Sequence, residues 1–364
     1  MRKVSVFFAV FALVGASCTK IQIADSGDSS PSKGAISLSA YTAMPTKAAQ
    51  TDVKTENFNS FQVSAIGKGA KYFDNVTFTK NSEGVWASSP AYFWPVYALD
   101  FYAYNTPVKG TFDRSISTSG QTLTFTPSTT LSEQEDLVAA YAANQTEPSG
   151  ATPLTFNHYL TQVIVKAKSS NANYKIVVDG VKLANIVGNG TYTFSDNKMT
   201  AGSTADAVYD ETFTTGKTLT TEAQEVMTNA GTGKWYLIPQ TTLTAWNQET
   251  DKSNNSNGAY LGLKVKITNA DGSYKVYPSS GDESAWMAIP ISTSDIAFAQ
   301  GKKYNITLNF FGNKGAGYVD PKEPGELDGD PSTSDAGKSI VGGAIKFSAT
   351  VTPWPDETVI TIDL

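Results

Sequence analysis

The sequence predicts an all-β protein built of two tandem antiparallel β-sandwich domains. Its 364 residues are enough for two ordinary domains of about 150 residues each. Apolar and polar side chains alternate with a period of two along many segments, as they do in strands that bury one face. Polar stretches rich in Gly, Asn, Asp and Ser separate these segments and favour turns. Because helical periodicity is scarce, we expect antiparallel sandwiches.

Residues 1–17 predict a secretory signal peptide. Two basic residues precede an apolar run from Val4 to Val14, and three small residues follow before Cys18, which is the order of a charged, an apolar and a cleavage region. Such a run is too short for a lasting membrane span. Cys18 is similar to the acylated cysteine of bacterial lipoproteins, although Gly15 stands where Leu is usual. The alternative is an ordinary secreted protein whose cysteine merely lies near the cleavage site.

Residues 18–47 are predicted to be a linker and a propeptide that contains the first strand. The linker is polar and rich in Ser, Asp and Gly, as in flexible spacers. The strand is an alternating segment with Ile36, Leu38 and Ala40 on one face. The residues after it, as far as Lys47, are polar and include a proline, which is typical of a connection open to proteolysis.

The N-terminal domain is predicted to span residues 48–150 and the C-terminal domain residues 151–364. A polar stretch with Pro and Gly, residues 144–152, marks the break. Residues 312–337 are expected to form a flexible loop, because they carry too little apolar surface to pack. Further strands are expected at Leu99 to Tyr104, Leu123 to Phe125, Val163 to Val165, Tyr304 to Leu308 and Ile345 to Val351.

The C-terminal residues 358–364 predict one more strand. Its apolar face carries Ile360, Ile362 and Leu364. Pro355 precedes it and would help it to leave its own domain, because proline cannot donate to a ladder of hydrogen bonds. Alternation alone does not separate a strand that pairs within its own sheet from one that is donated to another molecule.

Composition excludes several classes of function. The chain has 28 Lys and Arg against 34 Asp and Glu, a formal net charge of −6. Only Arg2 and Arg114 are arginines, so no basic stripe is present to neutralise phosphates, and nucleic acid is not an expected partner. A single Cys and a single His exclude disulfide frameworks and zinc sites made of Cys and His. No metal and no cofactor are predicted.

Two groups of residues could support an enzyme, but each has a simpler interpretation. His158 is the only imidazole, and no Gly-x-Ser-x-Gly turn accompanies it, so we expect a hydrogen-bonded structural residue near the domain junction. Glu133, Glu135 and Asp136 could serve glycoside hydrolysis. Such a cluster is more often a solvated face. The sequence therefore predicts no enzymatic activity.

Two further groups could bind ligands. Asp320, Asp335 and the pair at 328 and 330 could gather oxygen ligands for calcium, but their spacing departs from that of the EF-hand loop. The aromatic residues from Tyr92 to Tyr97 could stack on sugars. Large aromatic residues in a sandwich more often belong to its core.

Several segments, in order along the chain, resemble the fimbrillin family of lipoprotein pilins, which build the type V pili of Bacteroidales-type bacteria. The segments are Tyr92 to Pro95, Leu99 to Tyr104 with Pro107, Asp136 to Ala139, Phe156 to Leu160, Trp235 to Gln240, Gly301 to Tyr304, Gly315 to Tyr318 and Ile345 to Trp354. The resemblance implies transthyretin-like sandwiches for both domains. It also implies a fimbrial location at the cell surface and an outer-membrane lipoprotein precursor with palmitate on Cys18.

Members of this family polymerise by strand exchange, and the resemblance implies the same for this chain. Family precursors are usually cut between Arg and Ala, whereas Lys47 and Ala48 occupy that place here. The protease would therefore have to accept Lys. Removal of the first strand would expose an apolar groove with unpaired N–H and C=O groups, which is a template for an incoming strand. The candidate donor is the segment 358–364.

The sequence thus predicts a structural subunit, shaft or tip, of a cell-surface pilus that contributes to adhesion. Its expected partners are other pilin subunits, the outer membrane before processing, and a host or bacterial surface ligand. One alternative is a monomeric surface lipoprotein that binds glycan through its β-sandwich domains. A glycoside hydrolase that uses paired carboxylates is a third interpretation.

Overall fold

The computed structural model describes residues 34–42, 58–227, 233–248, 254–281, 283–312, 315–327, 334–343, 345–354 and 360–362. Strands dominate these residues, with one short 3₁₀ turn, η1, at Leu131–Glu133. The predicted all-β class is therefore confirmed. The transthyretin-like arrangement of two tandem domains stays a prediction.

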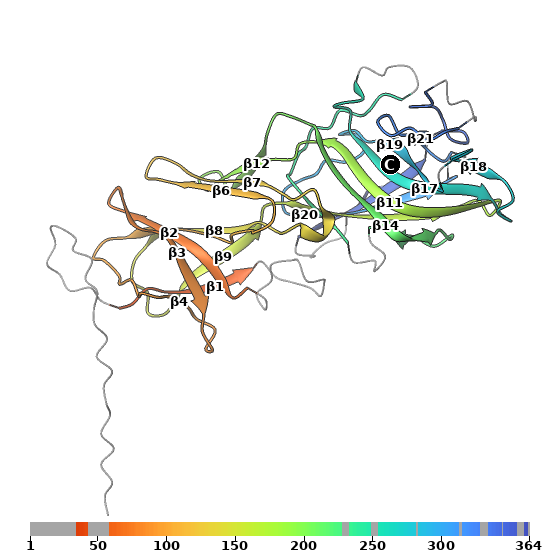
Figure 1. Ribbon diagram of the computed structural model, residues 1–364. Coiled ribbons are helices and arrows are strands. Elements are labelled where there is room, and N and C mark those ends of the chain that lie inside the picture. The colour runs from red at the N-terminus through yellow and green to blue at the C-terminus, as the bar shows by residue number, and fades with distance from the viewer. Residues whose placement is uncertain are drawn as a thin grey trace, which may run out of the picture.

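The N-terminal part of the chain forms a closed barrel in the order β1-β4-β3-β2-β5-β8-β9 (Figure 1). Its strands are β1 Ser37–Thr42, β2 Ser60–Gly67, β3 Ala70–Lys80, β4 Trp86–Ser88, β5 Leu99–Tyr104, β8 Val138–Gln145 and β9 Thr152–His158. Neighbouring strands run antiparallel except for β1 and β9, which are parallel. Closure leaves no strand with an unpaired edge.

Strand β5 is buried on both faces and connects two cores. Phe101 and Ala103 belong to the hydrophobic interior of the barrel. Tyr102 and Tyr104 belong to a second cluster on the other side of the strand. A four-stranded sheet, in the order β13-β12-β7-β6, covers this second cluster. Its strands are β6 Thr111–Ile116, β7 Gln121–Thr126, β12 Gly190–Thr193 and β13 Lys198–Ala201.

The C-terminal part is a sandwich of two sheets that share one large core, which includes Val163, Val178 and Leu308. The first sheet has the order β15-β10-β20-β22-β23, with β16 also on β10, and the second β14-β11-β17-β19-β21, with β18 also on β17. The strands of the first are β10 Thr161–Ser169, β15 Gln224–Glu225, β16 Trp235–Leu237, β20 Lys302–Phe310, β22 Lys346–Pro353 and β23 Ile360–Ile362. Those of the second are β11 Tyr174–Ile186, β14 Ala207–Thr218, β17 Tyr260–Asn269, β18 Lys275–Tyr277, β19 Ala285–Pro290 and β21 Tyr318–Val319.

The pairing of the strands near residue 150 does not support a domain boundary at that residue. Strand β9 begins at Thr152, yet it pairs with β8 and β1 and so belongs to the barrel. In addition, β12 of the C-terminal half pairs with β7 of the N-terminal half. Hydrogen bonding therefore favours a division after His158 rather than within residues 144–152.

Part of the segment 312–337, expected to be a flexible loop, is packed. Ala316, Val319 and Asp320 are buried, and β21 pairs with β19. Burial is achieved here with small side chains and one buried ion pair rather than with many apolar ones. Lys182 of β11, itself 2% exposed, places its Nζ 3.5 Å from Oδ2 of Asp320 and 4.2 Å from the ring centroid of Trp286.

The carboxylate of Asp320 is held from several sides. Its Oδ1 accepts the backbone N–H groups of Lys322 and Glu323 at 2.8 and 2.9 Å. The side chain of Glu323 also contacts Nζ of Lys182. A buried carboxylate with these partners fixes the turn after β21 against the sheet.

We predict that Lys182→Ala lowers the free energy of unfolding by about 3–5 kcal/mol, because it leaves Asp320 buried without its cation. Lys71→Ala is the matched control. Its partner Asp74 and Lys71 itself are both partly exposed, so a loss of about 0–1 kcal/mol is expected. Denaturant unfolding measures both. Equal, small losses for the two variants would contradict a stabilising role of the buried pair.

Candidate functional site

The seat of β1 in the barrel is the candidate site, and we define it as the two strands that flank β1. On one side, Leu38 to Thr42 pair in parallel with Thr152 to Phe156 of β9. On the other side, only Ser37 and Leu38 pair with residues of β4. Strand β1 is therefore held mainly by β9. These two are the first and the last strands of the barrel along the chain.

The three residues that the sequence places on the inner face of the first strand are buried. Ile36, Leu38 and Ala40 are 2%, 0% and 2% exposed and belong to the core of the barrel. Burial of each larger apolar side chain contributes about 1.5–3 kcal/mol. With β1 absent, this core would open along a groove between β4 and β9.

The aromatic segment Tyr92 to Trp94 lies beside the residues that lead into β1. The N–H of Ile36 donates to the carbonyl of Tyr92 at 2.7 Å, and the N–H of Trp94 donates to the carbonyl of Gly34 at 3.0 Å. Trp94 is 2% exposed and packs edge-on against Phe101. It offers no free ring face to a sugar, as the core interpretation of this segment predicts.

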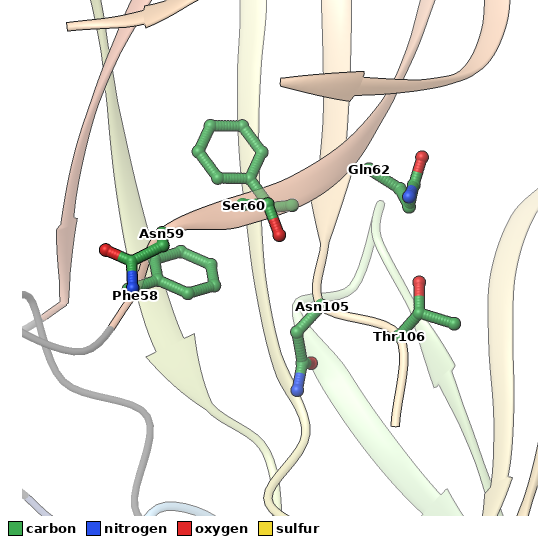
Figure 2. Close-up of a pocket in the computed structure, with 7 residues that line it drawn as sticks. Phe58, Asn59, Ser60, Gln62, Asn105 and Thr106 are labelled. Atoms are coloured by element: carbon green, nitrogen blue, oxygen red, sulfur yellow. The ribbon is translucent and has the colours of Figure 1, made fainter. Parts of the chain in front are cut away.

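A small hollow of about 390 Å³ lies at the rim of the barrel (Figure 2). Figure 2 shows Phe58, Asn59 and Ser60 at the start of β2, with Asn105 and Thr106 just beyond the end of β5. Asn105 already uses both ends of its amide, since it donates to the carbonyl of Asp136 and accepts the N–H of Val138. The hollow is thus lined partly by an amide that serves the fold.

The C-terminal strand lies at the edge of its sheet. Residues Ile360 to Ile362 form β23, which pairs with Val351 to Ala349 of β22 over three residues. Among the described strands, β22 is its one partner. Ile360 and Ile362 therefore occupy an outer position rather than the middle of the sandwich. Leu364 lies outside the described residues.

His158 has a structural environment at the junction of the two parts. Its Nδ1 is 2.7 Å from Oδ2 of Asp136, and both residues are buried. Its ring stacks on Trp354, with centroids 4.2 Å apart, and Trp354 stacks in turn on Tyr236. Trp354 follows directly on β22, so the base of the C-terminal segment is packed against the barrel.

The acidic residues considered for glycoside hydrolysis also serve the fold. Asp136 is the partner of His158. Oε2 of Glu135 accepts the N–H groups of Val108 and Lys109, and Glu133 pairs with the Lys109 side chain. Each of these three carboxylates thus has at least one contact within the fold.

Among the described residues, no group of three or more His, Cys, Asp or Glu side chains comes together as a metal ion would require. Asp335, considered for calcium, accepts the N–H of Leu327 and pairs with Lys338. In that part of the chain, no helix is both long and apolar enough to cross a bilayer.

Three more predicted positions, besides Leu364, lie outside the described residues. They are Cys18, Lys47 and Ala48, so acylation and cleavage stay predictions.

Sequence reasoning missed the residues that surround β1. Trp86 and Thr152 flank Leu38 in register, and Oε1 of Glu147 accepts the N–H of Gly34 at 2.6 Å. No local pattern marks these residues, because their roles depend on pairing between distant segments. The alternation of side chains along β9, with Leu154 and Phe156 two and four residues after Thr152, is a signal in the sequence for one of them.

We predict that Ile36→Ala lowers the free energy of unfolding of the full chain by about 2–5 kcal/mol, since it removes a buried side chain from the barrel core. Ser37→Ala, at the next position and with a half-buried side chain, is the control and should change stability by less than about 0.5 kcal/mol. Denaturant unfolding monitored by tryptophan fluorescence compares them. Equal effects would mean that β1 does not belong to the cooperative core.

Comparison with known proteins identifies the family. The family model for fimbrillin-like proteins matches residues 46–354. No curated protein matches the chain. Similar solved structures include candidate cell adhesion proteins from Bacteroides uniformis (15% identity, 88% of this chain and 100% of that one, TM-score 0.45), Bacteroides ovatus (14%, 83% and 100%, 0.44) and Parabacteroides distasonis (13%, 88% and 100%, 0.42). Because the family match extends over most of its length, the chain belongs to the fimbrillin-like family.

Proposed function

We propose that the chain is a structural subunit, shaft or tip, of a cell-surface type V pilus and that it contributes to adhesion. It is exported as a lipoprotein acylated at Cys18 and anchored in the outer membrane. Cleavage between Lys47 and Ala48 then releases the propeptide with its β1 strand. A neighbouring subunit fills the vacated seat with its C-terminal strand, 358–364. Other pilin subunits are therefore its partners.

The observation that carries this proposal is the way in which β1 closes the barrel. It pairs with both β4 and β9 and buries three side chains. All the other strands of the barrel come after residue 58. Cleavage at Lys47 would thus separate one strand of the barrel from the rest while leaving all the others on one chain. The empty seat would present two unpaired strand edges and an apolar groove, which an extended segment can complete.

The position of the C-terminal strand supports the same proposal. Strand β23 lies at an edge and pairs over three residues with β22 alone. Withdrawing an edge strand breaks one ladder and leaves the remaining sheet intact. Its alternating residues match the alternation of β1, so a transferred strand would turn Ile360 and Ile362 toward the barrel core of the neighbour.

We predict that the chain starting at Ala48 assembles into oligomers, whereas the full chain stays monomeric, because only the shortened chain has a vacant seat. Removal of residues 358–364 from the shortened chain should abolish assembly. Size-exclusion chromatography with light scattering, and electron microscopy for rods, measure the outcome. Exchange of Ile360, Ile362 and Leu364 for Ser serves as a second variant that keeps the length of the tail.

The full chain without residues 358–364 is the control for folding, and it should remain a folded monomer. If the chain starting at Ala48 is folded but monomeric at high concentration, with its tail present, strand exchange is wrong for this protein.

We predict that Cys18→Ser prevents acylation and releases the precursor from the membrane fraction, because Cys18 is the only thiol in the chain. Metabolic labelling with a palmitate analogue and fractionation of cells expressing the full chain test this. Sequencing of the N-terminus of the surface protein adds a second readout. Ala48 as the first residue agrees with processing, and an unlabelled wild-type protein would contradict the lipoprotein assignment.

A further inference from the structure

Leu38 lies between two buried residues, each of which has a polar side-chain atom without a hydrogen-bond partner among the described residues. In register, Leu38 stands opposite Trp86 of β4 and opposite Thr152 of β9. Trp86 is 3% exposed and Thr152 is 1% exposed. Within the described residues, neither Nε1 of Trp86 nor Oγ1 of Thr152 has a partner. The apolar side chain of Leu38 cannot form a hydrogen bond with either atom.

This arrangement departs from the normal pattern of protein cores, where buried donors and acceptors are paired. An unpaired buried polar atom is destabilising, because it has lost its contact with water without a replacement. Neighbouring strands lie about 4.8 Å apart, so residues in register on them are close neighbours. A side chain with a hydroxyl or a carboxamide at the register of Leu38 could therefore reach both neighbours. It would accept the indole N–H of Trp86 and bond to the hydroxyl of Thr152.

We infer that the seat of β1 is matched to a strand with a hydroxyl-bearing side chain at the level of Leu38, and that the C-terminal strand of a second copy supplies it with Thr358. This inference rests on the proposed strand exchange and adds to it the register and the chemistry of the incoming strand. Strand β1 of the propeptide then fits the seat less well than the C-terminal strand that replaces it, because Leu38 has no hydroxyl group.

The choice of Thr358 comes from the alternation of the tail. The face that carries Ile360, Ile362 and Leu364 contains one hydroxyl residue, Thr358. If the strand enters in the direction of β1, Thr358 falls at the level of Leu38 and Ile360 at that of Ala40. A register that places Ile360 or Ile362 at the level of Leu38, two or four residues away, would leave both polar atoms unpaired.

The chemistry of the seat is tested in the full chain with two variants of equal shape, Leu38→Thr and Leu38→Val. In an ordinary apolar core, Thr is less stable than Val, because its hydroxyl is buried without a partner. Here we expect the reverse, with the unfolding midpoint of Leu38→Thr about 2–4 °C above that of Leu38→Val. Slower hydrogen exchange of the Trp86 indole N–H in the Thr variant is the second readout.

Leu154→Thr and Leu154→Val form the control pair. Leu154 is 1% exposed in β9 and stands opposite Ala40, so Val should be the more stable variant there. A lower midpoint for Leu38→Thr than for Leu38→Val overturns the inference, because the seat would then behave as a purely apolar site.

The register is tested with peptides of residues 356–364 and a full chain that carries a specific protease site inserted after Lys47. After cleavage, a labelled wild-type peptide should enter the seat, and the Thr358→Val peptide should bind about 3–10-fold more weakly. The Ile362→Thr peptide should also bind no better than wild type. Equal or tighter binding of the Thr358→Val peptide overturns the register.

The two tests also separate this inference from the proposed function. If no peptide binds, strand exchange and the proposed occupant both fail, and the comparison at position 38 still decides the chemistry of the seat. If the peptides bind but the two predicted orders are reversed, strand exchange stands and the matched hydroxyl is wrong.

Discussion

Closure of the barrel by β1 is the constraint on which the rest of the molecule depends. Without β1, both β4 and β9 end in an unpaired edge, and the aromatic core behind Leu38 faces solvent. The hydrogen bonds and burial that hold a strand in a sheet do not require it to be covalently joined to its neighbours. The strand that completes this barrel can therefore come from the same chain or from another one.

In the proposed exchange, the first strand must hold the barrel together without fitting it perfectly. Strand β1 meets the first need through its five residue pairs with β9 and its buried side chains. The unpaired polar atoms of Trp86 and Thr152 on either side of Leu38 limit its fit. Departures from ordinary packing rules are expected at functional sites, where stability is given up for a change of state.

Local sequence patterns predicted the strands. The features that the sequence did not predict depend on contacts between residues far apart in the chain. Alternation is a property of consecutive residues, so the buried faces of β1 and β20 can be found in the sequence. The parallel pairing of β1 with β9 joins segments more than a hundred residues apart and leaves no local mark. The same holds for Lys182 and Asp320, whose contact packs a segment that composition alone predicts to be a loop.

The two positions available to a C-terminal strand differ in what they offer. At the edge of its own sheet, β23 bonds to one strand only, over three residues. In the seat of β1, a strand bonds on both sides and buries one face in a barrel core. Each additional hydrogen bond contributes about 1 kcal/mol, and each buried aliphatic side chain contributes about 1.5–3 kcal/mol. Under the proposed strand exchange, transfer is favoured once a seat is empty, whereas a tail that meets an occupied seat stays on its own sheet. In that proposal, removal of one strand by cleavage is enough to give assembly its direction.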